Sequence, residues 1–175
     1  MKWTRALEDY RLYLRLERGL SDNSIQNYSL DVHKLINFLD VNSIKLSPLD
    51  ISEETIQQFI YEMAKSLNPR SRARLISGLR GFFNFLVFED YRKGNPLDLI
   101  EAPTPGRQIP DLMSTEEINR LISAIFLSNA EGERNRAILE TLYGVGLRVS
   151  ELVNLKLSYH FLEAGFIKVS RTCNK

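Results

Sequence analysis

The chain has 175 residues, which suits one large or two small domains, and its 43% hydrophobic and 26% charged residues are ordinary for a globular protein. The formal net charge of +1 indicates no partner by itself, and one cysteine, Cys173, with two separated histidines excludes a disulfide framework and gives no metal-ligand pattern. No apolar run could span a bilayer and no signal-peptide pattern is present, so we expect a cytoplasmic protein with no membrane partner and no metal.

Three amphipathic helices are predicted within the first 64 residues. The first helix ends at Gly19, after which Ser21 or Asp22 can cap the second. A loop over residues 42–52, which contains Pro48, separates the second helix from the third. The apolar stripes are Trp3, Leu7, Tyr10 and Leu14 in the first helix; Ile25, Tyr28, Val32, Leu35, Ile36 and Leu39 in the second; and Ile56, Phe59, Ile60 and Met63 in the third.

A fourth helix, predicted over residues 71–88 after Asn68-Pro69, has two unlike faces. At 3.6 residues per turn, one face is broad and apolar, and it consists of Leu75, Ile76, Leu79, Phe82, Phe83 and Leu86. The opposite face is small and polar, with Arg80 at its rim. Its residues are Arg70, Arg74, Ser77, Gly78, Gly81 and Asn84.

The polar face of this helix is strongly basic. Residues 65–88 contain Lys65, Arg70, Arg72, Arg74 and Arg80 but no acid, so the global charge hides a local charge of +5. Small residues on a basic face let a phosphate backbone approach, and Ser or Asn can bond to phosphates or base edges. The DNA-contacting residues that we predict are Arg70, Arg72, Arg74, Ser77, Arg80 and Asn84. The alternative is a solvated helix surface whose glycines serve tight helix packing.

A proline-rich segment divides the chain. Gly94-Asn95-Pro96 ends the helical region, and residues 101–110 include three prolines, which disfavour regular structure. We therefore predict a helical DNA-binding domain over residues 1–100, a linker over residues 101–110, and a second domain over residues 111–175.

The second part opens with a helix signal. Ser114 and Glu117 are spaced as a capping box, and the stripe Ile118, Leu121, Ile122 and Ile125 follows. Residues 131–133 read as a polar break before the next helix. That helix runs into Gly144 and Gly146, which can end it, and a new apolar stripe starts at Val149.

Arg148 is the candidate site residue of this part. We expect it at a bend between two core-packed helices, with its guanidinium near a helix N-terminus that suits phosphate. Residues 165–170 read as one strand without a partner. About 65 residues after the linker are also few for an independent core, so we expect the sequence to stop inside a domain.

Three blocks of the sequence resemble the tyrosine recombinases of the phage-integrase class, and among them the bacterial Xer recombinases, XerD-like ones in particular. Residues 143–152 (YGVGLRVSEL) are similar to the family's block around its first catalytic arginine. Residues 24–28 (SIQNY), with Asp31 and Leu35, and residues 72–83 (RARLISGLRGFF) resemble its second and fourth helices. The resemblance covers nearly the whole chain, and the arginine block is its most specific part.

The resemblance implies a mainly α fold: an N-terminal four-helix core-binding (SAM-like) domain, then the truncated start of an α+β catalytic domain. It also implies site-specific recombination of double-stranded DNA, with a paired recombinase subunit and no cofactor, because a 3′-phosphotyrosyl link conserves the broken bond. In this picture the catalytic residue is Arg148, whose planar fork can hold two phosphate oxygens. Glu151, one helical turn later, would orient it.

The sequence also departs from the family pattern. The position of the family's catalytic lysine falls on Thr172, and neither Tyr143 nor Tyr159 matches the nucleophilic tyrosine. The His-x-x-Arg motif of the family has no match in the chain either. Two interpretations stay open: a truncated recombinase acting in DNA integration and chromosome dimer resolution, or a non-catalytic DNA-binding protein derived from one. A helical protein-interaction module is a third, which the basic fourth helix disfavours.

Overall fold

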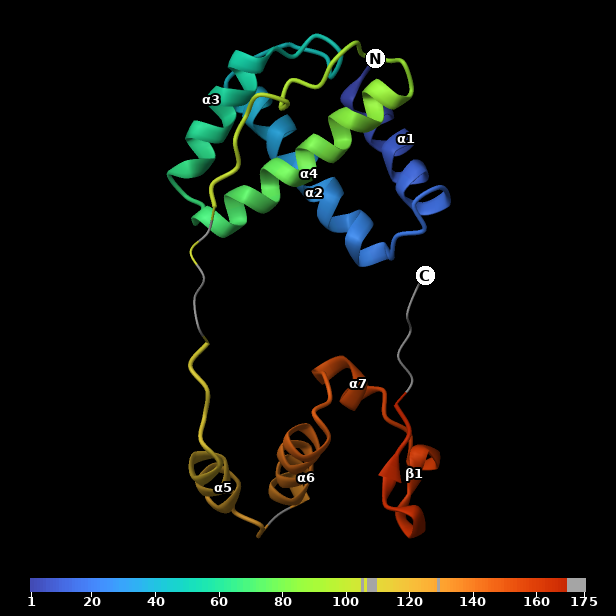
Figure 1. The fold of residues 1–175 in the computed structure, drawn as a ribbon, viewed down its shortest axis with the longest axis vertical. Coiled ribbons are helices and arrows are strands. Elements are labelled where there is room, and N and C mark those ends of the chain that lie inside the picture. Colours follow the sequence, from blue (N-terminus) through green and yellow to red (C-terminus); the bar gives the residue numbers. More distant parts are fainter. Residues whose placement is uncertain (105, 107–109, 129, 170–175) are drawn as a thin grey trace. The chain divides into compact units, whose positions relative to one another are not determined.

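The computed structural model describes residues 1–104, 106, 110–128 and 130–169 (Figure 1). The chain divides into two compact units, and the division falls inside the predicted linker. We call the described residues up to 106 the helical unit and those from 110 onwards the C-terminal unit. The helical unit contains α1 (Trp3–Leu16), α2 (Asp22–Val41), α3 (Glu53–Ala64) and α4 (Pro69–Phe88).

Side-chain caps begin three of these helices, and one of them, Ser21, was predicted. Ser21, Ser52 and Asn68 each accept a hydrogen bond from the backbone N–H three residues later. Such caps satisfy N–H groups that the first helical turn leaves without an intrahelical partner. Pro69 occupies the first turn of α4, where its fixed φ suits a helix start, so α4 begins two residues earlier than predicted.

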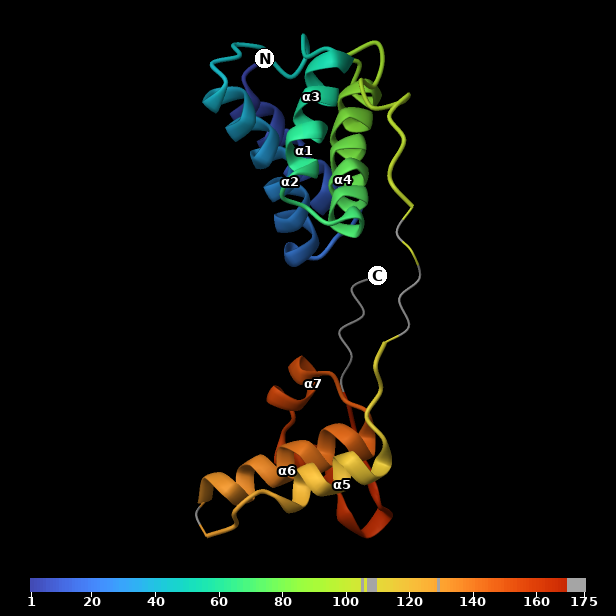
Figure 2. The same ribbon diagram turned by 90° about the vertical axis from the view of Figure 1, so that its left-hand side faces the viewer.

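One core joins the four helices (Figures 1 and 2). The predicted stripes form most of it: Tyr10 of α1 meets Phe82 of α4 edge to face at a centroid distance of 5.3 Å. Phe38 of α2, which was not in the predicted stripe, meets Phe59 of α3 in the same way. The apolar face of α4 is fully buried, so α4 is the central helix of the unit. The remaining fully buried side chains include Leu35, Ile51, Ile56 and Leu97.

A close approach between α2 and α4 interrupts the apolar packing. Asp31 of α2 is fully buried, and its carboxylate lies against Gly78 of α4. A Cβ added at Gly78 would lie 2.5 Å from Asp31 Oδ2, well inside van der Waals contact. The two helices can therefore cross this closely only because residue 78 has no side chain.

The C-terminal unit contains α5 (Thr115–Ser123), α6 (Ala130–Val145), α7 (Val149–Val153), β1 (His160–Phe161) and β2 (Phe166–Ile167), with short 3₁₀ turns at Leu157–Tyr159 and Leu162–Ala164. The predicted capping box is confirmed, because Ser114 and Glu117 each bond to the other's backbone N–H. The pKa of Glu117 lies below its usual value because its carboxylate accepts hydrogen bonds from Ser114.

Two predictions of secondary structure for this unit were wrong. Residues 131–133 are not a break but lie in the first turn of α6, where acidic side chains interact favourably with the helix dipole. The predicted strand is shorter, and it has a partner: β2 pairs antiparallel with β1, with Phe161 opposite Phe166. Gly165 has φ +67° and allows the tight return, and the two phenylalanine rings stack at 4.6 Å.

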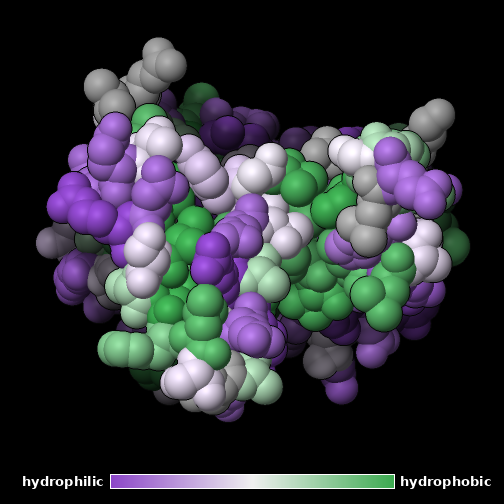
Figure 3. Space-filling model, turned by 90° about the horizontal axis from the view of Figure 1, so that it is seen from below, coloured by the Kyte–Doolittle hydropathy of each residue, from purple (hydrophilic) through white to green (hydrophobic). Residues whose placement is uncertain are grey.

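The C-terminal unit has almost no buried core. Among the residues from 110 to 169 whose burial the structure describes, only Gly132 is buried. Our expectation of two core-packed helices around Arg148 was therefore wrong, whereas the small size of this part had indicated a poor core. Figure 3 shows hydrophobic residues (green) at its surface, and the large exposed ones include Leu121, Phe126, Tyr143, Val149, Val153, Leu157 and Phe166. None of the described helices is long and apolar enough to cross a membrane.

Gly78→Ala should lower the free energy of unfolding of the helical unit by about 2 kcal/mol, because the new Cβ must displace Asp31. Helix propensity alone would favour alanine by about 1 kcal/mol, so the expected sign opposes propensity. Urea unfolding followed by circular dichroism measures the change. Gly94→Ala is the control, since no atom lies within 4 Å of its added Cβ, and a loss equal to that of Gly78→Ala would contradict the packing argument.

Candidate nucleic-acid interface

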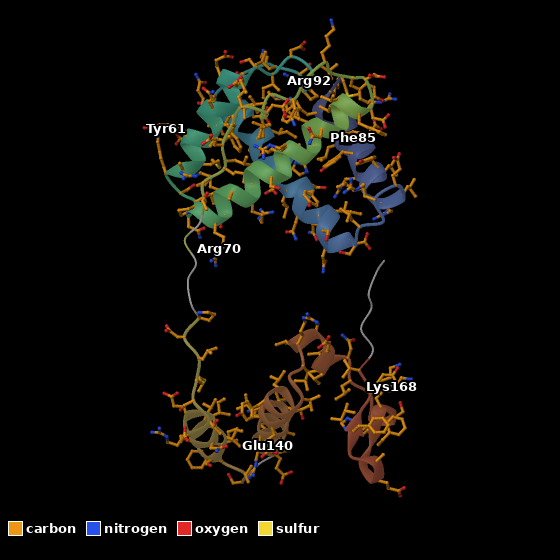
Figure 4. All side chains as sticks on the ribbon, in the orientation of Figure 1. Tyr61, Arg70, Phe85, Arg92, Glu140 and Lys168 are labelled. Carbon is orange, nitrogen blue, oxygen red and sulfur yellow. The ribbon has the colours of Figure 1, made fainter. Side chains whose placement is uncertain are left out.

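The exposed face of α4 carries the candidate interface. Arg70, Arg74, Ser77 and Asn84 are exposed and lie on one helical stripe, whereas Arg72 is half-buried. Arg70 lies at the N-terminal end of α4 (Figure 4). Within the described part of the chain, the side chains of Arg70 and Arg72 make neither a hydrogen bond nor an ion pair. Both guanidinium groups are thus available to a phosphate.

Arg74 makes a two-pronged ion pair with Asp31. Its Nη1 donates to Asp31 Oδ2 at 2.9 Å, and its Nη2 donates to Oδ1 at 2.7 Å. Lys34 Nζ approaches the same carboxylate at 3.5 Å. The Arg74 side chain is still 53% exposed, whereas that of Asp31 is fully buried. Arg74 therefore both neutralises a buried charge and presents part of its guanidinium to solvent.

Arg80 and Asn84 are partly engaged within the helical unit. Arg80 Nη2 donates to the backbone oxygens of Leu97 and Ile100, at 3.3 and 2.7 Å. Asn95 Nδ2 donates to Asn84 Oδ1 at 2.7 Å and to the Arg80 backbone oxygen at 3.1 Å. These bonds tie the segment that follows α4 back onto the helix.

We had expected the two glycines of the polar face to let a DNA backbone approach it, but they do not. Gly78 is buried against Asp31, and Gly81 is half-buried, with its added Cβ 3.1 Å from the hydroxyl oxygen of Tyr10. The glycine packing that the alternative interpretation expects is present, whereas DNA contact by the rest of the face stays a prediction. The part of the face that remains open is the stripe of Arg70, Arg74 and Ser77, with Asn84 further along.

Two side chains that hold the helical unit together were missed. Arg92 (Figure 4) donates to the backbone oxygens of Pro48, Leu49, Ile51 and Gly94, and burial lowers the pKa of its guanidinium. Its sequence context carries no signal for this role. The sequence did carry a signal for Asp31, because an acid directly before Val32 and four residues before Leu35 falls on the buried side of its helix.

Arg148 lies at the bend after α6, where Gly146 adopts φ +66°. It is the residue before α7, and its backbone N–H donates to Glu151 Oε2 at 2.8 Å. Its Nη1 also donates to Glu151 Oε1 at 3.2 Å, which is the contact that the spacing predicts. The Arg148 side chain is 72% exposed and that of Glu151 only 9%. Glu151 thus holds the backbone and the guanidinium of Arg148, while most of the guanidinium faces solvent.

The segment in which the lysine position falls, residues 171–175 with Thr172, lies outside the described residues. Its predicted departure from the family pattern therefore rests on sequence alone.

Comparison with known proteins agrees with both units. Residues 7–90 match the phage integrase N-terminal SAM-like domain, and residues 111–175 match the phage integrase family. The chain belongs to the tyrosine recombinase, or phage integrase, family. The predicted fold class, mainly α with a SAM-like core-binding domain followed by part of a catalytic domain, is confirmed.

Within that family the chain is similar to proteins named Tyrosine recombinase XerD. It is 34% identical to that of Listeria monocytogenes over 93% of this chain and 55% of the relative. It is 37% identical to that of Staphylococcus saprophyticus over 97% of this chain and 57% of the relative. The chain thus spans little more than half the length of these relatives.

The fold is also that of solved integrases. A lambda integrase dimer bound to a COC′ core site matches 99% of this chain and 46% of its own, at a TM-score of 0.74 and 18% identity. The integrase of mycobacterium phage Brujita matches 96% of this chain and 54% of its own, at a TM-score of 0.52 and 19% identity. At these identities the two structures establish the fold alone.

Replacing the arginines of α4 by alanine, one at a time, should lower the free energy of unfolding by different amounts. Arg74→Ala leaves the buried Asp31 carboxylate without its main partner and should lower the free energy of unfolding by about 2 kcal/mol. Arg80→Ala, which removes two bonds to backbone oxygens, should cost about 1 kcal/mol. Arg70→Ala and Arg72→Ala should stay within about 0.5 kcal/mol of the parent. Urea unfolding measures all four, and equal losses would contradict this division.

Proposed function

We propose that this chain is the DNA-binding and arginine-bearing portion of a Xer-like site-specific recombinase, acting in DNA integration and recombination and in chromosome dimer resolution. The observation that carries the proposal is the pair of family matches, because each matched region contains a candidate phosphate-binding site. The helical unit has an exposed basic stripe on α4, and the C-terminal unit has the arginine block at residues 143–152.

In this proposal α4 supplies the phosphate contacts. Arg70 and Arg72 act as charges whose side chains have no partner among the described residues, and Arg74 acts as an oriented fork. Ser77 and Asn84 add short polar groups on the same stripe, which suit phosphates or base edges. Arg80 contributes charge but keeps its bonds to the segment after α4. A second recombinase subunit is a further proposed partner, and the dimeric lambda integrase structure supports it by analogy.

The proposed role of Arg148 is to bind the phosphate that undergoes strand exchange. In the reaction that the family implies, a tyrosine hydroxyl attacks the phosphodiester, a 3′-phosphotyrosyl bond forms, and the 5′-hydroxyl leaves. Negative charge develops on the nonbridging oxygens, and a guanidinium fixed in place stabilises it. Glu151 holds that guanidinium from one side, so its other N–H groups remain for the phosphate.

The second candidate is a non-catalytic DNA-binding protein derived from a recombinase. Thr172 at the lysine position favours it, because a threonine cannot serve as a cationic general acid. In that case the helical unit would bind DNA as proposed and Arg148 would have no reaction to serve.

DNA binding should depend steeply on salt and on the arginines without an internal partner. The double variant Arg70→Ala/Arg72→Ala should make the slope of log K against log salt shallower by about 2, because each phosphate contact contributes about 0.9. Fluorescence anisotropy with a labelled duplex at several salt concentrations measures it. Lys45→Ala is the control, since the loop between α2 and α3 lies at the opposite end of the unit from the start of α4 (Figures 1 and 2). An equal change with Lys45→Ala, or binding insensitive to salt, would refute the proposed interface.

The 175-residue chain should not form a covalent link to DNA, because none of its tyrosines matches the family nucleophile. A nicked suicide substrate, which traps the 3′-phosphotyrosyl product, followed by denaturing electrophoresis tests this. If an adduct forms and Tyr143→Phe or Tyr159→Phe removes it, the proposed division between binding and catalysis is wrong.

A further inference from the structure

Asp31 is an acid placed directly beneath the proposed DNA-binding face. It is fully buried at the crossing of α2 and α4, and both of its oxygens accept a hydrogen bond from Arg74. Lys34 Nζ, at 3.5 Å, is its other charged partner among the described residues. Simple counting of charges assigns Asp31 an unfavourable role, because a carboxylate near the interface repels phosphate.

The geometry of the pair assigns it a different role. Two parallel N–H···O bonds fix both the position and the plane of a guanidinium, which a single bond does not. They use two of the five N–H donors of Arg74, and the side chain remains 53% exposed. The remaining donors are the Nε–H and the second N–H of Nη1 and of Nη2. They make no hydrogen bond within the described part of the chain, so they are available to a ligand.

The carboxylate is itself fixed from behind. Gly78 leaves so little space that a Cβ there would lie 2.5 Å from Asp31 Oδ2, so α4 limits the movement of the carboxylate towards it. Arg74 is therefore ordered when the protein folds, not when DNA binds. A long side chain that is already ordered loses less conformational entropy on binding. Arg70, on the same stripe, has no such contact within the described residues.

We propose that Asp31 is a positioning residue for DNA binding, which holds the Arg74 guanidinium so that its remaining N–H donors bind a backbone phosphate. The inference rests on the proposed function, since it requires that α4 faces DNA. The inference goes beyond the proposed function because it assigns a buried acid a favourable role in binding a polyanion.

The isosteric variant Asp31→Asn separates positioning from charge. It removes a negative charge near the interface, so charge counting predicts tighter binding, whereas loss of the fork predicts weaker binding. We expect roughly tenfold weaker binding to a fluorescein-labelled duplex of mixed sequence, measured by anisotropy on protein that circular dichroism shows to be folded. Asp40→Asn is the matched control: it makes the same change of charge at an exposed acid of α2 and should bind as well as the parent or slightly better.

The effect should also depend on Arg74. In an Arg74→Ala background, Asp31→Asn should cause no further loss of affinity, because there is no guanidinium left to position. Binding by Asp31→Asn that equals or exceeds that of the parent would overturn the proposal, and so would an unchanged loss in the Arg74→Ala background.

A second variant covers the case in which Asp31→Asn does not fold. Gly78→Ala keeps both charges and displaces the carboxylate, so it too should weaken binding, and unchanged affinity would overturn the proposal. Failure of the proposed function is distinguishable from either result, because the parent chain would then not bind the duplex in a salt-dependent way.

Discussion

At the crossing of α2 and α4, a carboxylate occupies space that any side chain at residue 78 would need. The two helices come together at Gly78, and the charge brought into the interior at Asp31 is then met by the fork of Arg74 and by Lys34. Taking an ion out of water is costly unless it is both paired and hydrogen-bonded, so each part of this arrangement requires the others. The orientation of the exposed α4 face therefore follows from a polar contact inside the core.

Some arginines of the helical unit have two roles: they hydrogen-bond to backbone oxygens within the unit, and they add positive charge to its surface. Arg92 directs its guanidinium at four backbone oxygens, and Arg80 directs its own at two. Both keep their charge, so both contribute to the long-range field that the proposed DNA partner would meet. They cannot reach out to a phosphate without giving up their bonds. Because Arg80 is one of the five basic residues in the local charge of +5, that charge overstates the number of side chains free to move onto a ligand.

Much of the helical unit could be predicted because its signals are local. Periodicity located the stripes around Tyr10 and Phe82, and Ser21 and Asn68 capped the helices they precede. The sequence could not show which helix faces which, so the partner of Asp31, 43 residues away, was missed, and the packing role of Gly78 stood only as the alternative interpretation. Residues 131–133 were misread because acidic residues suit a loop and a helical first turn equally well. The strand seemed unpaired because β1 is only two residues long.

The guanidinium in the arginine block of the C-terminal unit is oriented by a local contact, unlike that of Arg74 on the α4 face. Arg148 and Glu151 are three residues apart, and Glu151 bonds to both the backbone N–H and the guanidinium of Arg148. This geometry needs only one helical turn and a glycine bend, so it forms in a unit whose apolar side chains are largely exposed. Arg74, by contrast, takes its orientation from a residue on another helix. The two guanidinium groups proposed to bind phosphate therefore differ in what they require: for Arg148 a turn of chain is enough, and for Arg74 the whole helical core must be in place.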